Sequence, residues 1–257
     1  MAKIYGEKSR YLISLDRIND IAAFAYFILL FVIWYIVFIK NFDRISSSFI
    51  ELFVLLILFG PLFWFVYKKA KKHKRESDNY YYGRKGEYAI FYELKKLTNS
   101  YLIFQDIKIP NGKGNIDFVV LGPTGIFLIE AKSHSGNITF NGKELLINNH
   151  QFEKDVLKQT MWQSLELHHF ILGKSNEDYF INPILVFSSN HARMKFGIKP
   201  IKNVCIVQKA FLGKAILERP SIFSAEDITN LEKILLSFYT NKSFDVQLSN
   251  INKEVKN

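Results

Sequence analysis

The sequence contains one cysteine, Cys205, among its 257 residues. No intrachain disulfide can form, and a tetrathiolate zinc or iron–sulfur site within one chain is excluded. We expect Cys205 to be a reduced cysteine buried in a strand. Internal repeats and low-complexity tracts are absent as well. A fully disordered chain is excluded because 49% of the residues are hydrophobic.

The histidines provide no zinc-ligand spacing. His168 and His169 are adjacent in a predicted helix, so their side chains should point apart. The spacing of the other histidines of the globular segment does not match that of zinc ligands either; these are His134, His150 and His191. We therefore expect none of them to bind a metal ion.

Two long apolar runs dominate the N-terminal third. Residues 21–39 contain no charged side chain, and residues 49–67 contain only Glu51. Nineteen helical residues extend roughly 28 Å, close to the ~30 Å thickness of the hydrocarbon core of a bilayer. We interpret the runs as two transmembrane helices, with two buried core helices as the alternative. Glu51 is interpreted as a tolerated carboxylate near the outer end of its span.

Basic residues predict the orientation of this hairpin. The segment 68–75, KKAKKHKR, follows the second run, whereas the connection 41–48 carries only Arg44 and directly follows Lys40. The positive-inside rule then places both termini and the globular domain in the cytoplasm of a multi-pass membrane protein. Residues 68–75 should also attract anionic lipid, and a nucleic-acid-binding patch is the alternative interpretation.

Most of the net charge of +10 belongs to this anchor. Residues 1–75 carry +7 and residues 76–257 carry +3. Net charge therefore gives no indication that the globular part binds DNA. The organisation predicted is a membrane anchor over 1–75, a linker over 76–82, a globular domain over 83–240 and a polar tail over 241–257.

The globular segment alternates helix and strand patterns. Helices are predicted at 84–97, at 152–172 and from 224 to about 239, where Ser224 to Asp227 resembles a capping box. Strands are predicted at 101–109, 115–121, 126–132, 138–140, 144–147, 182–188 and 204–207. This order indicates an α/β fold with a mixed sheet flanked by helices.

Three charged residues fall on two of these strands. Asp117 lies in the strand 115–121, and Glu130 and Lys132 end the strand 126–132 on one face. The short turn at 122–125 would place the strands side by side, so that Asp117 could meet Glu130. Two carboxylates suit Mg²⁺ or Mn²⁺, and an adjacent lysine can hold a water molecule or stabilise an anionic transition state. An ordinary ion pair at a strand end is the alternative.

The segment 83–140 resembles the nuclease-related domain, within the wider PD-(D/E)xK nuclease-like group. The resemblance lies in four pieces of sequence: GRKGE at 83–87, IPNGKGNID at 109–117, GPTGIFLIEAK at 122–132 and GNI at 136–138. A weaker similarity extends to DVLKQ at 155–159. The resemblance implies a restriction-endonuclease-like fold and a nuclease activity.

The resemblance also implies roles for individual residues. Asp117 and Glu130 would be metal ligands for Mg²⁺ or Mn²⁺, and Lys132 the catalytic lysine. Glu87 would contact the metal or orient water, and Gln159 would contact phosphate or water. Relatives commonly have glutamine and histidine where Asn115 and Phe118 stand here, which affects the expected substrate contacts.

The function predicted is a membrane-anchored, divalent-metal-dependent nuclease, with DNA as the expected substrate by resemblance. The first alternative is a non-catalytic nuclease-fold module that tethers nucleic acid or a protein partner to the membrane. The second is a membrane scaffold or sensor in which the helical hairpin transmits a signal. The modest charge of the globular part and the two departures beside Asp117 keep the first alternative open.

Overall fold

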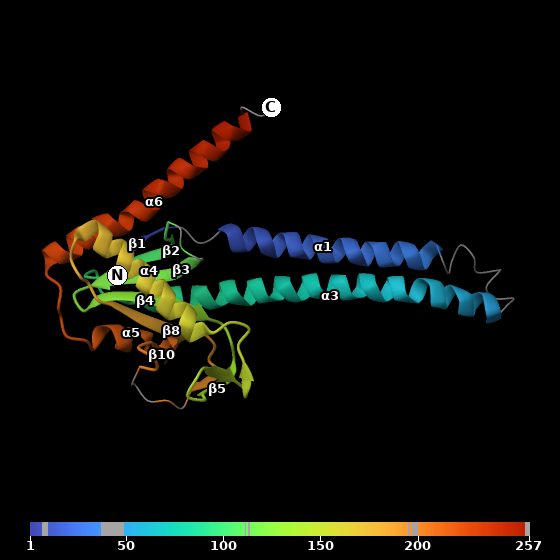
Figure 1. Cartoon of the computed structure of the whole chain (residues 1–257), viewed down its shortest axis with the longest axis horizontal. Coiled ribbons are helices and arrows are strands. Elements are labelled where there is room, and N and C mark those ends of the chain that lie inside the picture. The colour runs from blue at the N-terminus through green and yellow to red at the C-terminus, as the bar shows by residue number, and fades with distance from the viewer. Residues whose placement is uncertain are drawn as a thin grey trace. The chain divides into compact units, whose positions relative to one another are not determined.

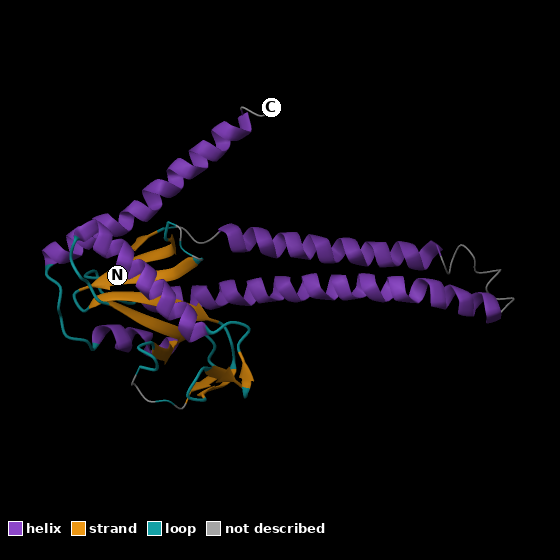
Figure 2. Ribbon diagram, viewed as in Figure 1, coloured by secondary structure: helices purple, strands orange, loops and turns teal. Residues whose placement is uncertain are grey.

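The computed structural model describes residues 1–6, 10–36, 49–110, 112, 114–194, 196 and 200–254. Its centre is a mixed six-stranded sheet in the order β1-β2-β3-β4-β8-β10 (Figures 1 and 2). The strands are β1 (Lys3–Tyr5), β2 (Leu102–Lys108), β3 (Asn115–Gly122), β4 (Gly125–Lys132), β8 (Ile181–Phe187) and β10 (Cys205–Gln208). The predicted α/β class with a mixed sheet flanked by helices is confirmed.

The middle of this sheet carries the residues of interest. β2, β3 and β4 are antiparallel neighbours, and Gly122 pairs with Gly125 at the tight turn between β3 and β4. β8 runs parallel to β4 and pairs with it as far as Lys132 and Phe187. β4 is apolar on both faces because it lies inside the sheet, which explains its continuous run of buried residues from Gly125 to Glu130.

Helices cover both faces of the sheet. One core contains Leu167 of α4 (Val156–Ser175) and Leu231 of α6 (Ala225–Glu254), packed against side chains of β2, β3 and β4. The other core contains Ile90 of α3 (Phe49–Leu94) and Leu212 of α5 (Lys209–Leu217). The buried residues of α4 recur at the three- and four-residue spacing of an amphipathic helix.

A second, smaller sheet lies beside the first. Its order is β7-β6-β5-β9, formed by β5 (Gly136–Phe140), β6 (Leu145–Ile147), β7 (His150–Gln151) and β9 (Ala192–Met194). The hairpin of β5 and β6 turns at Asn141, whose side chain accepts hydrogen bonds from the backbone amides of Lys143 and Glu144. The hairpin predicted at 138–147 is therefore confirmed.

The N-terminus contributes an edge strand that the sequence did not predict. β1, within the segment assigned to the membrane anchor, pairs in parallel with β2 through Lys3–Leu102, Ile4–Ile103 and Tyr5–Phe104. This pairing joins residues almost a hundred positions apart, so no local pattern could indicate it. The hydroxyl of Tyr5 and the ammonium of Lys3 both donate hydrogen bonds to Glu232 of α6.

The chain divides into two compact units, residues 1–8 with 85–257, and residues 9–84. α3 is continuous across the division, so the predicted linker 76–82 is helical. In the second unit, α1 (Arg10–Trp34) contacts the basic segment of α3. Asp20 accepts hydrogen bonds from Ser77 and Lys74, at 2.8 and 3.3 Å, and Tyr26 stacks on His73.

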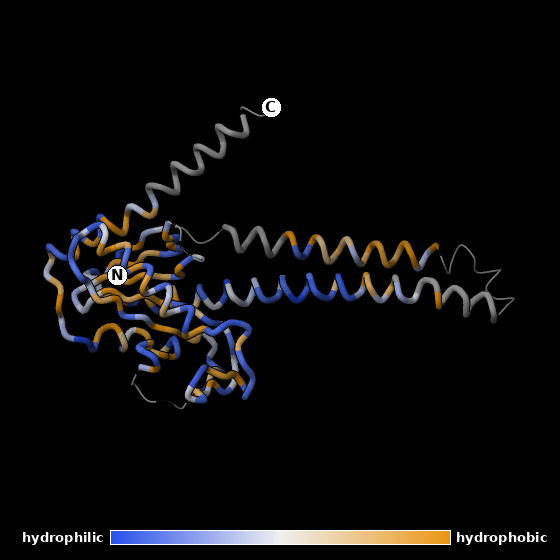
Figure 3. Tube along the Cα trace, viewed as in Figure 1, coloured by the Kyte–Doolittle hydropathy of each residue, from blue (hydrophilic) through white to orange (hydrophobic). Residues whose placement is uncertain are grey.

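The apolar residues of α1 are concentrated in its C-terminal half, whereas the middle of α3 is hydrophilic (Figure 3). Within the described residues, no helix combines the length and apolarity needed to cross a membrane. The two predicted transmembrane helices are thus unsupported. Residues 37–39 of the first predicted span and the predicted outer loop 41–48 lie outside the described residues.

α6 begins as predicted and ends later. Asp227 accepts a hydrogen bond from the backbone amide of Ser224, and the Ser224 hydroxyl accepts one from the amide of Asp227, which confirms the capping box. The sequence placed the end of the helix near Tyr239 and treated 241–257 as a polar tail. The helix continues to Glu254 because no glycine or proline interrupts it.

Candidate active site

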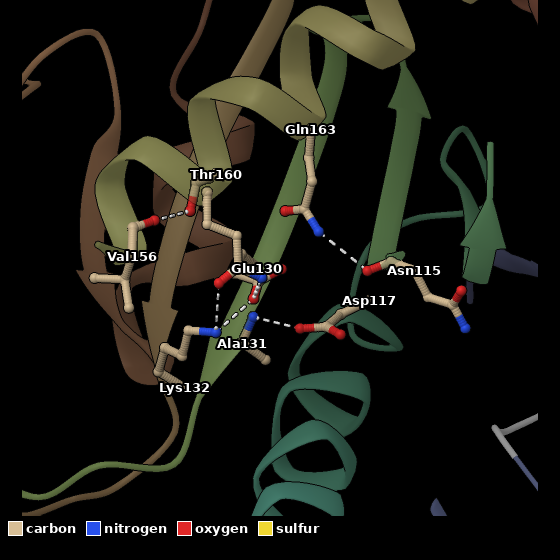
Figure 4. A network of polar contacts seen from close by, with 9 residues as sticks. Asn115, Asp117, Glu130, Ala131, Lys132, Val156, Thr160 and Gln163 are labelled. Carbon is tan, nitrogen blue, oxygen red and sulfur yellow. Dashed lines mark hydrogen bonds and ion pairs between the residues drawn. The ribbon is translucent and has the colours of Figure 1, made fainter. Parts of the chain in front are cut away.

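Glu130, Lys132 and Gln159 form the centre of the candidate site, and Figure 4 shows Glu130 and Lys132 together at the end of β4. The Lys132 ammonium donates a hydrogen bond to Glu130 Oε1 at 2.5 Å, and Gln159 Nε2 donates to the same oxygen at 2.7 Å. Lys132 Nζ also lies 3.5 Å from Gln159 Oε1. The Glu130 residue is only 3% exposed, so its charge depends on these two donors.

The strand geometry explains why Glu130 and Lys132 share this site. They are two residues apart at the end of β4, so their side chains leave the same face of the sheet. Gln159 approaches that face from α4. The proximity of these three side chains follows from one strand end and one helical turn.

Asp117 joins the cluster through the backbone. Its Oδ2 accepts a hydrogen bond at 2.7 Å from the amide of Ala131, which lies between Glu130 and Lys132. The β3–β4 ladder ends one pair earlier, at Phe118 and Ile129, and its register would place Asp117 opposite Glu130. The side chain of Asp117 therefore binds β4 just beyond the last backbone pair.

The pairing of β3 with its other neighbour, β2, is also irregular at Asp117. The β2–β3 ladder pairs Gln105 with Phe118 and Ile107 with Ile116, but omits the pair between them. Asp106 occupies the omitted position with a φ of 51°, in the left-handed region. Asp117 therefore lies at a position where β3 lacks a regular backbone pair with β2, and its carboxylate bonds to the amide of Ala131.

Negative charges surround Asp117. Burial raises its pKa well above the ordinary value, and the neighbouring carboxylates of Glu130 and Glu87 raise it further. The Ala131 amide and the Lys132 ammonium oppose this shift. The structure therefore brings Glu87 into the electrostatic neighbourhood of Asp117.

A close helix–sheet contact positions Glu87. Its neighbour Gly86 is buried, and a Cβ atom there would lie 2.7 Å from Ser188 Oγ and 3.0 Å from Ser133 Cβ. Only glycine allows α3 to approach the ends of β4 and β8 this closely. By contrast, a Cβ at Gly83 would meet nothing within 4 Å. The second glycine of the GRKGE segment thus sets the position of the adjacent glutamate.

An N-cap fixes the position of Gln159. Asp155 begins α4, and its side chain accepts a hydrogen bond from the amide of Lys158 at 3.0 Å. The amide of Gln159 donates to the carbonyl of Asp155 at 2.9 Å, which is the first helical hydrogen bond. Gln159 therefore lies in the first turns of a capped helix.

The sequence did not single out Gln163. This residue lies one helical turn after Gln159 and is buried, and its Nε2 donates to the carbonyl of Asn115 at 3.0 Å (Figure 4). Asn115 in turn donates through Nδ2 to Asp106 Oδ1 at 2.6 Å. The spacing of four residues between Gln159 and Gln163 could have indicated that both side chains lie on the helix face toward the sheet.

Two observations bear on metal binding. Among the described residues, no group of three or more His, Cys, Asp or Glu side chains is arranged to hold a metal ion. Glu130 Oε2, however, is buried without a hydrogen-bond partner, beside the acidic Asp117. Mg²⁺ is commonly bound by one or two carboxylates together with water and substrate phosphate. Asp117 and Glu130 fit this donor set.

The comparison with protein families covers the same residues. Residues 82–188 match the family model described as the nuclease-related domain, NERD. No curated protein and no solved structure matches the chain. The matched segment runs from the end of α3 through β8 and contains Glu87, Asp117, Glu130, Lys132 and Gln159. Residues 82–188, less than half of the chain, are therefore similar to the nuclease-related domain.

Proposed function

We propose that this protein hydrolyses phosphodiester bonds of nucleic acid in a reaction that depends on a divalent metal ion, with DNA as the expected substrate. The supporting observation is the convergence of Asp117, Glu130 and Lys132 within the nuclease-related domain. A structural ion pair alone would not need a second buried carboxylate, because two anions in a partly dry site repel each other.

Each side chain has a role in this proposal. Lys132 provides an ammonium group that can hold the attacking water or offset negative charge on the phosphate. Gln159 provides an amide that can donate to a phosphate oxygen or to water. Both now donate to Glu130 Oε1, so binding of substrate would exchange these hydrogen bonds for contacts to phosphate.

Asp117 and Glu130 would hold a Mg²⁺ or Mn²⁺ ion, and Glu87 would orient water near it. A bound ion of this kind polarises phosphate and lowers the pKa of water. The unpartnered Glu130 Oε2 is the ligand atom that this proposal uses. Because that atom is buried, neighbouring side chains must move before an ion can reach it.

The test is a cleavage assay on the full chain with single-stranded DNA, duplex DNA and RNA. We expect cleavage with Mg²⁺ or Mn²⁺, none with EDTA, and a loss of at least about 100-fold in Lys132→Ala. Lys174→Ala, an exposed lysine at the far end of α4, serves as the matched control and should cleave normally. Undiminished metal-dependent cleavage by Lys132→Ala would exclude this site.

A non-catalytic tether is the second candidate. One observation favours it: both donors around Glu130 already satisfy Oε1, which is the arrangement of a structural network. This candidate predicts salt-dependent binding of nucleic acid that persists in EDTA and in Lys132→Ala, with no cleavage under any metal.

We also propose that α1 attaches the protein to a membrane, with the globular domain on the cytoplasmic side. Large apolar side chains of α1, including Ile21, Phe24 and Phe31, are exposed, and a surface of this kind is unusual for a protein that meets only water. The basic segment 68–75 would contact anionic lipid. Flotation with vesicles that contain phosphatidylglycerol tests this attachment, and a chain that stays out of the lipid fraction would contradict it.

A further inference from the structure

Trp162 lies on α4, three residues after Gln159, and its side chain faces away from the core. The residue is 56% exposed, although tryptophan has the largest aromatic side chain and is on average well buried. Within the part of the chain that the structure describes, no hydrogen bond or ring contact involves its indole. Packing therefore does not explain a tryptophan at this position.

The helix under Trp162 is well anchored. Thr160, Gln163 and Ser164 are buried on the inner side of α4, and Leu157 and Leu167 pack into the cores below. Residues three apart on a helix have Cβ atoms about 5–6 Å from each other. Trp162 is thus a rigidly mounted neighbour of Gln159, whose amide lies 2.7 Å from Glu130.

Charged side chains of both signs lie near the indole, including Glu166 one helical turn after it and Glu153 before the helix. Lys158 is exposed one helical turn before Trp162, and Lys154 is exposed just before the helix. Asp155, the acidic residue between them, uses its carboxylate to cap the helix. An exposed aromatic face with a lysine one helical turn away can bind single-stranded nucleic acid through base stacking and a phosphate contact.

We propose that Trp162 is a stacking platform for an unpaired base next to the scissile phosphate, with Lys158 contacting the backbone. This inference rests on the proposed nuclease function and adds a preference for single-stranded substrate. In a duplex the bases are already stacked and paired, so they cannot lie on the indole without being extruded. The preference thus originates from one exposed side chain beside the acidic cluster.

The experiment measures binding of a fluorescein-labelled oligothymidylate to the full chain by anisotropy in EDTA, where no cleavage occurs. Trp162→Ala should weaken binding roughly 5- to 150-fold, and Trp162→Phe should retain most of the affinity because a phenyl ring still stacks. Binding of a duplex of equal length should change by less than about threefold in either variant.

Phe180→Ala is the matched control. Phe180 is 68% exposed, but it precedes β8 at the end of the sheet opposite to Phe187, which pairs with Lys132. Its removal should leave oligothymidylate binding unchanged. If Trp162→Ala binds like the wild type and like Phe180→Ala, or loses duplex and single-strand binding equally, the platform is wrong.

Binding and cleavage measured on the same proteins distinguish a failure of the stacking platform from a failure of the proposed nuclease activity. Lys132→Ala should lose cleavage while it keeps stacking on Trp162 and therefore retains most oligothymidylate binding. A wild-type chain that cleaves DNA but prefers the duplex would overturn the platform alone. A wild-type chain that neither binds nor cleaves any nucleic acid would overturn both.

Discussion

The Asp117 carboxylate accepts a hydrogen bond from the amide of Ala131, between Glu130 and Lys132, at 2.7 Å. This contact extends the β3–β4 connection beyond its last backbone pair, Phe118–Ile129. The same contact holds a second carboxylate beside Glu130 despite the repulsion between them. Lys132 pairs directly with Glu130, so the ionised form of Asp117 is only partly offset and destabilises the metal-free cluster.

Asp117→Asn should raise the melting temperature of the metal-free protein at pH 7. The pKa of Asp117 is raised by burial and by Glu130 and Glu87, so its ionised form destabilises the folded state, and a neutral amide can still accept the Ala131 hydrogen bond. Differential scanning calorimetry in EDTA measures the effect.

Addition of Mn²⁺ to the same samples should make the wild type melt at a higher temperature than Asp117→Asn. Wild-type protein should gain stability as the ion binds, by about 2.7 kcal/mol at a hundred times the dissociation constant. Asp117→Asn should gain little, because it lacks one ligand. Equal stabilisation of both proteins by Mn²⁺ would show that the ion binds elsewhere.

Lys132→Met should destabilise the fold by roughly 2–4 kcal/mol, since it leaves the Glu130 carboxylate without its ammonium partner in a site where Lys132 itself is only 18% exposed. The double variant Glu130→Gln/Lys132→Met should recover much of this loss, because the buried charge is then gone. Urea denaturation of the wild type, both single variants and the double variant gives the coupling free energy between Glu130 and Lys132. Losses of stability that simply add would show that the two side chains are not energetically coupled.

Gly86→Ala should destabilise the fold by about 1–3 kcal/mol, because its Cβ would lie 2.7 Å from Ser188 Oγ and 3.0 Å from Ser133 Cβ, and Ser133 cannot yield without movement of its backbone. Gly83→Ala is the matched control on the same helix. It meets nothing within 4 Å and should stabilise slightly, by up to about 1 kcal/mol. Chemical denaturation of both variants measures the contrast, and equal effects would remove the steric explanation.

Glu232→Gln should reduce stability at pH 7, and the deficit should disappear as the pH falls below about 4. Hydrogen bonds from Tyr5 and then Lys3 lower the pKa of Glu232, so its carboxylate stabilises the fold above the ordinary glutamate pKa and loses that effect on protonation. Because the pair is partly exposed, we expect less than about 1 kcal/mol.

Tyr5→Phe provides the control for this pH dependence. It removes the principal hydrogen bond to Glu232 while the β1–β2 pairing remains possible. In the Tyr5→Phe protein, Glu232→Gln should reduce the stability at pH 7 by less than it does in the wild type. Thermal melts from pH 3 to pH 7 measure both, and a deficit that is independent of pH would indicate that glutamine simply packs badly.

Local patterns predicted most of the globular fold. β3, β4 and their turn were predicted because apolar runs flank GPTG, and α4 and the start of α6 followed from apolar spacing and a capping box. Non-local features were not accessible. β1 pairs with a strand almost a hundred residues away, and the left-handed conformation of Asp106, opposite Asp117, was not predicted from the sequence.

The candidate site was partly predictable for the same reason. Glu130 and Lys132 converge because residues two apart in a strand lie on the same face of the sheet. Asp117 lies beside them because a tight turn pairs its strand with theirs. Gln159 and Glu87 required the resemblance to the nuclease-related domain, since their helices approach the sheet only in the folded protein. Gln163 and Trp162 were missed because ordinary helix faces contain such residues.

Anomalous diffraction from crystals of the full chain soaked in Mn²⁺ shows directly whether Asp117 and Glu130 hold a metal ion. We expect a peak beside the carboxylates of Asp117 and Glu130 in the wild type, and no peak there in Asp117→Asn. A saturated soak with no peak between these carboxylates, or with Lys132 and Gln159 still bound to Glu130 and manganese bound elsewhere, would contradict the proposed metal-dependent nuclease site.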